Sequence, residues 1–224
     1  MQASLRPYCL LLLAAGVPAG SAAVSPREPE RATHTAEAAA VYASPAQRFL
    51  HTLRGLCGKA FAGRVVADSP ASADDPFANK PLVMHVRECA DAQVRIPFHV
   101  GDDRSRTWVL TYDAARQSLQ LKHDHRHADG SSDPLTLYGG DSRTPVSSPA
   151  GAWRVEFPAD AESKALFRTL DRAVSVDNVW AMELDAQRFV YELARPQRLF
   201  RVEFDLTRPQ PVPPPPWGAG GASP

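Results

Sequence analysis

Apolar and polar residues alternate with a period of two along much of this chain. In the segment 93–100, apolar residues at every second position alternate with polar ones such as Arg95 and His99. Successive side chains of a strand point to opposite faces, so this pattern is typical of strands with one buried face. The alternation predicts strands in the segments 61–66, 82–86, 94–100, 108–112, 119–127, 135–138, 153–157, 179–185, 189–193 and 199–206. Gly139 and Gly140 are expected to end the strand 135–138.

Two short helices are expected among these strands. Ser44 followed by Pro45 is a favourable helix start, because serine caps the N-terminus and proline suits the first helical position. Apolar residues follow at helical spacing, and Gly58 is a suitable stop. Asp160 is a suitable N-cap for a second helix that extends to Leu170.

Short strands, tight turns and few helices together predict the fold class. We expect a mainly β protein, a single antiparallel up-and-down β-barrel of about ten strands with two short helices. A closed barrel is favoured because closure removes exposed sheet edges. The barrel domain is expected over residues 44–208.

The two ends of the chain differ in composition from its middle. Residues 1–23 combine a positive start, an apolar run and small residues at Ser21-Ala22-Ala23, which predicts a signal peptide and an exported, periplasmic or extracellular protein. The apolar run is too short to span a bilayer, so we expect no integral membrane segment after cleavage. Residues 24–43 predict a flexible linker, and the Pro/Gly-rich residues 209–224 predict a disordered tail.

Cysteine content and charge narrow the picture further. Cys57 and Cys89 remain after removal of the signal, and an oxidising compartment favours a disulfide between them. The alternative is two buried free thiols. The chain has 25 Lys and Arg residues against 25 Asp and Glu residues. This balance argues against nucleic acid as the main partner, because nucleic acid favours a basic surface.

An opening helix, a first strand flanked by Gly58 and Gly63, and a meander of about ten strands resemble the calycin superfamily. That superfamily includes lipocalins, fatty-acid-binding proteins and nitrobindin-type haem-binding barrels. The resemblance covers most of residues 45–206 and lies in the architecture. The Gly-x-Trp frequent on the first strand of such barrels is absent, and no haem ligand carries over. An uncharacterised family of bacterial exported proteins is also similar, in the segments 56–61, 84–89, 122–127 and 179–183.

Three histidines share one predicted strand. His123, His125 and His127 lie on the same face as Leu119 and Leu121, so we expect them to point toward the barrel interior or its mouth. Histidines two residues apart have Cα atoms about 6.5–7 Å apart, and their rings can converge on one metal ion. Histidines four residues apart are separated by about 13 Å, so a pair is favoured over all three.

A metal site built on such a pair needs further ligands. Candidates are His85 and His99 on earlier strands, Asp129 just beyond the histidines, and Tyr138 across the next hairpin. Histidine and carboxylate ligands suit zinc, copper or iron. One alternative is a polar ligand-binding or catalytic pocket without metal, and another is a structural or surface role for the histidines.

A second group of candidates follows the turn at residues 101–105. Arg104 and Arg106 are suited to bind an anion at a barrel mouth, although solvated turn charges without a function are the favoured explanation. Tyr138 is a further candidate ligand-binding residue beside the histidines. No recognisable catalytic motif is present, so a non-enzymatic protein is favoured and enzymatic activity is left open.

These patterns favour an exported binding protein that holds a small molecule or a metal ion at the His-x-His-x-His strand. One alternative is a metal-dependent enzyme that uses a pair of these histidines. The other is an envelope interaction protein, in which the tail and the surface act and the histidines are incidental.

Overall fold

A computed structural model describes residues 44–71, 76–147 and 151–219. The predicted signal peptide at 1–23 and linker at 24–43 lie outside the described residues. The helices are α2 (Pro45–Arg54) and α3 (Ala161–Thr169), with a short 3-10 helix η1 (Ala173–Ser175). The strands are β1 (Ala60–Ser69), β2 (Leu82–His85), β3 (Glu88–Cys89), β4 (Gln93–Val100), β5 (Asp103–Asp113), β6 (Ser118–His125), β7 (Tyr138–Asp141), β8 (Val146–Ser147), β9 (Trp153–Pro158), β10 (Val179–Leu184), β11 (Arg188–Arg195) and β12 (Arg198–Gln210).

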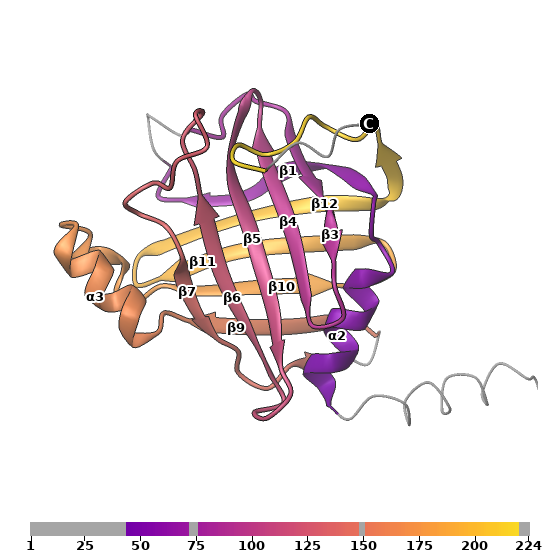
Figure 1. Ribbon diagram of the computed structural model, residues 1–224, viewed down its shortest axis with the longest axis horizontal. Helices are drawn as coiled ribbons and strands as arrows, with labels where there is room; N and C mark the ends of the chain where they lie inside the picture. The colour runs from indigo at the N-terminus through magenta and orange to yellow at the C-terminus, as the bar shows by residue number, and fades with distance from the viewer. Residues whose placement is uncertain (1–43, 72–75, 148–150, 220–224) are drawn as a thin grey trace, which may run out of the picture. The chain divides into compact units, whose positions relative to one another are not determined.

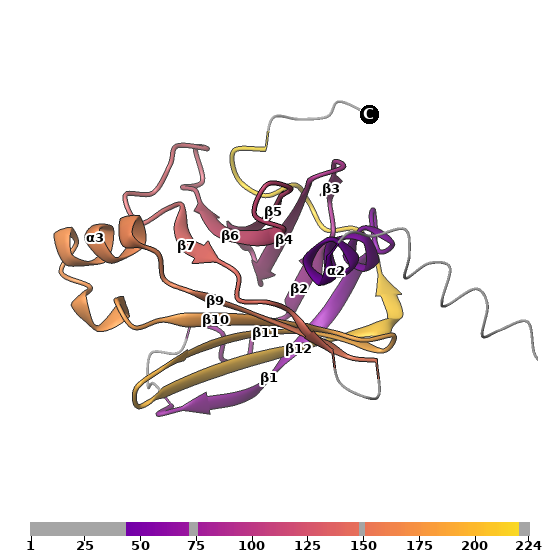
Figure 2. The same ribbon diagram turned by 90° about the horizontal axis from the view of Figure 1, so that it is seen from below.

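The twelve strands form one antiparallel sheet, ten strands of which curl into a nearly closed barrel. Their order is β7-β6-β5-β4-β2-β1-β12-β11-β10-β9-β8, and β3 pairs with β4 outside this path. Apart from β1 and β12, and from β2 and β4 with the short β3 between them, neighbouring strands follow one another along the chain, so the connections form an up-and-down meander. In Figure 1 and Figure 2, β4, β5 and β6 face β9 to β12 across the barrel. The predicted mainly β barrel with two short helices is confirmed.

The seam of the barrel lies between β7 and β9. The N–H of Asp160 donates to the carbonyl oxygen of Gly139 at 2.9 Å, and the N–H of Arg143 donates to that of Glu156 at 2.8 Å. A Cβ atom on Gly140 would lie 1.9 Å from the carbonyl oxygen of Pro158. Glycine is therefore required where the two edges of the sheet approach each other.

The strand predicted at 135–138, with glycines as its end, is wrong in position. The structure begins β7 at Tyr138 and carries it through both glycines to Asp141. Asp133 Oδ1 accepts a hydrogen bond from the N–H of Leu135 at 2.7 Å, which holds that residue in a turn. A Cβ atom on Gly139 would lie 1.8 Å from the carbonyl oxygen of Leu121, so this glycine allows close pairing with β6 and does not end the strand.

Both helices begin at the predicted caps. Ser44 Oγ accepts from the N–H of Gln47 at 3.2 Å, and Asp160 Oδ1 accepts from the N–H of Ser163 at 2.8 Å. α2 packs against β4, β5 and β6, and α3 packs against β7 and η1. The two helices lie at opposite ends of the barrel in both views (Figure 1, Figure 2). No helix within the described ranges is long and apolar enough to cross a bilayer.

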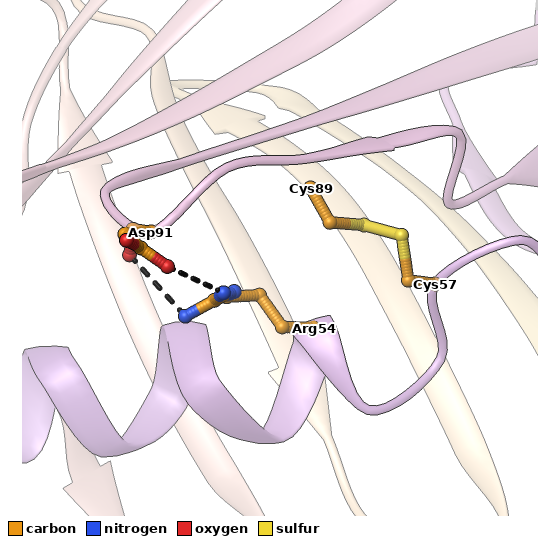
Figure 3. Close-up of a disulfide and its surroundings, with 4 residues drawn as sticks. All are labelled: Arg54, Cys57, Cys89 and Asp91. Atoms are coloured by element: carbon orange, nitrogen blue, oxygen red, sulfur yellow. Dashed lines mark hydrogen bonds and ion pairs between the residues drawn. A yellow bond between two sulfur atoms is a disulfide. The ribbon is translucent and has the colours of Figure 1, made fainter.

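The predicted disulfide is present between Cys57 and Cys89. It joins the segment after α2 to β3, with Cα atoms 6.3 Å apart (Figure 3). Nearby, Arg54 Nη2 lies 2.9 Å from Asp91 Oδ1 and makes a second link between the same two segments. The opening helix is therefore tied to the sheet covalently as well as by packing.

The tail predicted to be disordered from residue 209 is ordered as far as residue 219. β12 continues to Gln210, which pairs with Ala60 on β1. Beyond it, the N–H of Trp217 donates to the carbonyl oxygen of Arg104 at 3.0 Å, and Arg104 Nη1 donates to that of Pro215 at 3.1 Å. An extended proline segment has no internal hydrogen bonds, so its carbonyl groups are available as acceptors, and Arg104 of β5 donates to one of them. We call residues 211–219 the C-terminal strap.

Candidate functional site

A cavity of about 230 Å³ lies inside the barrel. Its wall is mainly aromatic, and buried rings come from β4, β5, β10, β11, β12 and α3. Stacking orders this wall, since the ring centroids of Trp108 and Tyr191 are 4.4 Å apart. The rings that line it are Phe77, Phe98, Trp108, Tyr138, Phe167, Trp180, Tyr191 and Phe200.

His123 lies in this wall, fully buried and bonded at both ring nitrogens. Nδ1 lies 3.1 Å from the carbonyl oxygen of Tyr138, and Nε2 lies 2.8 Å from the hydroxyl oxygen of Tyr191. A carbonyl oxygen can only accept, so Nδ1 carries the hydrogen and Tyr191 donates to Nε2. Burial, and then the nearby His125, lower the pKa of His123 to about 3. A neutral imidazole is thereby held in one tautomer.

His125 lies on the same face of β6 as His123, as the two-residue period of the strand requires, and nearer the open end of the cavity. Its Nε2 is 3.1 Å from the hydroxyl oxygen of Tyr138, and its N–H donates to Thr136 Oγ1 at 2.8 Å. Burial, and then the charge of Arg106, lower the pKa of His125 to about 4. Burial raises the pKa of Tyr138. His125 and Tyr138 therefore present a neutral hydrogen-bonding pair to the cavity at pH 7.

Arginine supplies all the formal charge on the cavity wall. Arg106, Arg195 and Arg198 line it, and among the described residues that line it there is no Asp or Glu. The guanidinium of Arg106 lies 5.7 Å from the ring centroid of Phe77, and that of Arg198 lies 5.7 Å from that of Phe200. These arginines are partly exposed, whereas the rings beyond them are mostly buried, so they mark the mouth of the cavity.

The structure thus brings four of the predicted residues to one cavity: Arg106, His123, His125 and Tyr138. It places two others away from it. His127 lies past the end of β6, with 52% of its side chain exposed and its Nε2 3.9 Å from Asp133 Oδ2. Asp129 is exposed in the following turn, where its Oδ1 accepts from the N–H of Ser131. A strand that ends at His125 cannot keep His127 on the inner face.

His99 and Arg104, also expected to bind a ligand, lie on the outer face of the barrel. His99 is buried there opposite Val83, since it is out of phase with inward-facing Phe98. Burial, and then His85, lower the pKa of His99 to about 4. Arg104 binds the C-terminal strap, and both residues line a separate cleft with Pro213 and Pro214.

The geometry gives little support to a metal site. In the described part of the chain, no three His, Cys, Asp or Glu side chains come together to hold an ion. Both nitrogens of His123 are engaged in hydrogen bonds, so either would have to be released before it could ligate zinc, copper or iron. The pair His123 and His125 has no carboxylate among the described lining residues to complete it.

Several lining residues escaped the sequence reasoning. Arg195 and Arg198 flank the turn between β11 and β12, where charged residues are common and carry no signal. Trp108, Trp180 and Tyr191 occupy apolar positions of alternating strands, a pattern that predicts ordinary core residues. Only the closed barrel shows that these rings surround a space.

No family model, curated protein or solved structure matches this chain. The site is therefore interpreted from its own geometry.

Proposed function

We propose that this chain is an exported binding protein that holds a small organic molecule inside its barrel. The observation that carries this proposal is the cavity, which has an aromatic wall and a polar mouth. Ligand sites are typically concave and apolar, with a few polar groups that fix orientation. At about 230 Å³ the cavity is smaller than the roughly 300–1,000 Å³ usual for drug-sized ligands, which favours a small ligand.

The arrangement of polar groups supports an organic ligand over a metal ion. His123 is committed to Tyr138 and Tyr191, and so acts as a brace between two walls of the cavity. His125 and the hydroxyl of Tyr138 lie at the mouth and offer hydrogen bonds to a ligand there. We favour a binding role over a metal-dependent enzyme. An organic ligand can bind while His123 keeps both of its hydrogen bonds, whereas a metal ion could bind His123 only after one of them is broken.

Export and ancestry belong to the same proposal. The disulfide between Cys57 and Cys89 supports export, because such bonds persist in oxidising compartments. The meander whose first long strand pairs with its last, β1 with β12, supports a relationship to calycin-type barrels. In this proposal the chain reaches its ligand outside the cytoplasm.

Titration calorimetry with a neutral aromatic probe, 2-naphthamide, tests the binding role. Leu135 lines the cavity, so Leu135→Trp should fill part of it and weaken binding at least about tenfold. Val66→Trp is the matched control, because Val66 is 39% exposed on β1 and lies outside the cavity. Equal affinity in both variants would contradict the proposal.

A further inference from the structure

Among the described residues, one of the three arginines at the cavity mouth has no acidic partner. Arg106 pairs with Asp103, whose Oδ2 lies 2.5 Å from Nη1. Arg198 pairs with Asp68. No Asp or Glu in the described ranges forms an ion pair with Arg195, the third arginine of the wall. Asp177 lies beside Arg195 at the surface but forms no ion pair with it, so the guanidinium of Arg195 remains unpaired among the described residues.

The surroundings of Arg195 make that charge costly. Its Nη1 donates to the amide oxygen of Asn178 at 3.3 Å, a long and neutral hydrogen bond. Burial, and then the charge of Arg198, lower the pKa of Arg195. A partly buried guanidinium beside a second one is stabilised most by an anion, which accepts charge-assisted hydrogen bonds from it.

The positive charge also acts inside the cavity. The charge of Arg106 helps to lower the pKa of His125, after the larger effect of burial. It also opposes the rise that burial causes in the pKa of Tyr138 and of Tyr191. Asp133 acts on His125 and Tyr138 in the opposite sense. The charged side chains among the described lining residues are nevertheless all arginines, and charge of one sign in a low-dielectric wall favours a ligand of the opposite sign.

We infer that the ligand is a small amphipathic anion, with an apolar or aromatic body among the cavity rings and a carboxylate or similar anionic group at Arg195. This inference rests on the proposed binding role and adds the ligand's chemical class. Arg195 provides the missing ion pair, while Arg106 and Arg198 keep their own aspartates. The hydroxyl of Tyr138 and the ring of His125 are neutral donors or acceptors for the remainder of the ligand.

Two probes of nearly the same shape test the inference. 2-Naphthoate carries a carboxylate where 2-naphthamide carries a neutral amide, and calorimetry gives the affinity of the full chain for each. We expect the wild type to bind naphthoate at least about tenfold more tightly. In Arg195→Gln this preference should fall to within about twofold, and Arg195→Lys should restore part of it. Arg208→Gln is the control, because Arg208 is an exposed arginine of β12 outside the cavity.

The outcomes separate this inference from the binding role. If both probes bind the wild type equally, the anionic class is wrong. If Arg195→Gln keeps the naphthoate preference, the assignment of the anionic group to Arg195 is wrong. In either case the binding role stands. If neither probe binds the wild type at about 1 mM, both proposals fail. Thermal unfolding of each variant shows whether it is folded. If Arg195→Gln does not fold, Arg195→Lys still tests the role of Arg195.

Discussion

Tyr191 donates its hydroxyl hydrogen to Nε2 of His123 at 2.8 Å, across the interior of the barrel. The bond joins β11 to β6, which belong to facing walls. His123 in turn holds the carbonyl oxygen of Tyr138 on β7 at 3.1 Å. Three strands are thus connected through one neutral imidazole, and the cavity keeps its form around it.

Removing the hydroxyl of Tyr191 tests this connection. Tyr191→Phe leaves Nε2 of His123 buried without a donor, so we expect the free energy of unfolding to fall by about 1–3 kcal/mol. Urea denaturation measures the change. Tyr112→Phe is the control, since the hydroxyl of Tyr112 makes a longer, partly buried contact with Ser44 and its loss should cost less. Equal losses in the two variants would show that the brace has no special role.

His123 contributes to the acid sensitivity of the fold, in the same sense as His99 and His125, whose pKa values burial lowers to about 4. His123 has a pKa of about 3 when folded, against an ordinary value of 6.5. Between these values the unfolded chain binds a proton that the folded chain does not, so stability is lost as the pH falls from 6.5 toward 3. His123→Gln should remove up to about 1.4 kcal/mol per pH unit from this dependence.

Unfolding free energies measured between those pH values check this prediction against a matched variant. His127→Gln removes an exposed histidine at the end of the same strand and should leave the slope as in the wild type. If His127→Gln flattens the pH dependence as much as His123→Gln does, the buried imidazole is not its source.

The disulfide should contribute strongly to stability. A loop of 32 residues between Cys57 and Cys89 corresponds to about 3–4 kcal/mol in the chain-entropy model. A variant with both cysteines changed to serine should lose about that amount in chemical denaturation. Reductant should destabilise the wild type and leave the double variant unchanged. A wild type that is equally stable with and without reductant would show that the bond is dispensable.

The seam of the barrel depends on glycine at position 140. Gly140→Ala places a methyl group 1.9 Å from the carbonyl oxygen of Pro158, so the edges of β7 and β9 must separate. We expect a loss of about 2 kcal/mol or more in unfolding free energy. Gly55→Ala at the end of α2 is the control, because Gly55 has an ordinary helical φ of −61° and its nearest contact is 3.1 Å. A similar small loss in both would contradict the close seam.

Regular alternation made much of the fold predictable from the sequence. Period two placed His123 and His125 on the inner face together with Leu121, and the caps Ser44 and Asp160 located both helices. The same reasoning failed where tertiary contact decides. Gly139 was read as a strand end, because sequence carries no sign that another backbone approaches it.

The candidate site was predictable only on its histidine side. Tyr138 was found because it follows the histidines across the next hairpin, and Arg106 because it follows a turn where arginines could bind an anion at a barrel mouth. Arg195 was missed because it comes from a hairpin about 70 residues away and joins the site only when β1 pairs with β12 and brings the two halves of the sheet together. The C-terminal strap was missed for a related reason, since its partners on β5 are remote in sequence.

A crystal structure of the full chain grown with saturating 2-naphthoate tests the central claim most directly. The account predicts the naphthyl ring inside the barrel between Trp108 and Trp180, with its carboxylate within hydrogen-bonding distance of the Arg195 guanidinium. An empty cavity, or naphthoate bound only on the outer face of the barrel, would contradict it.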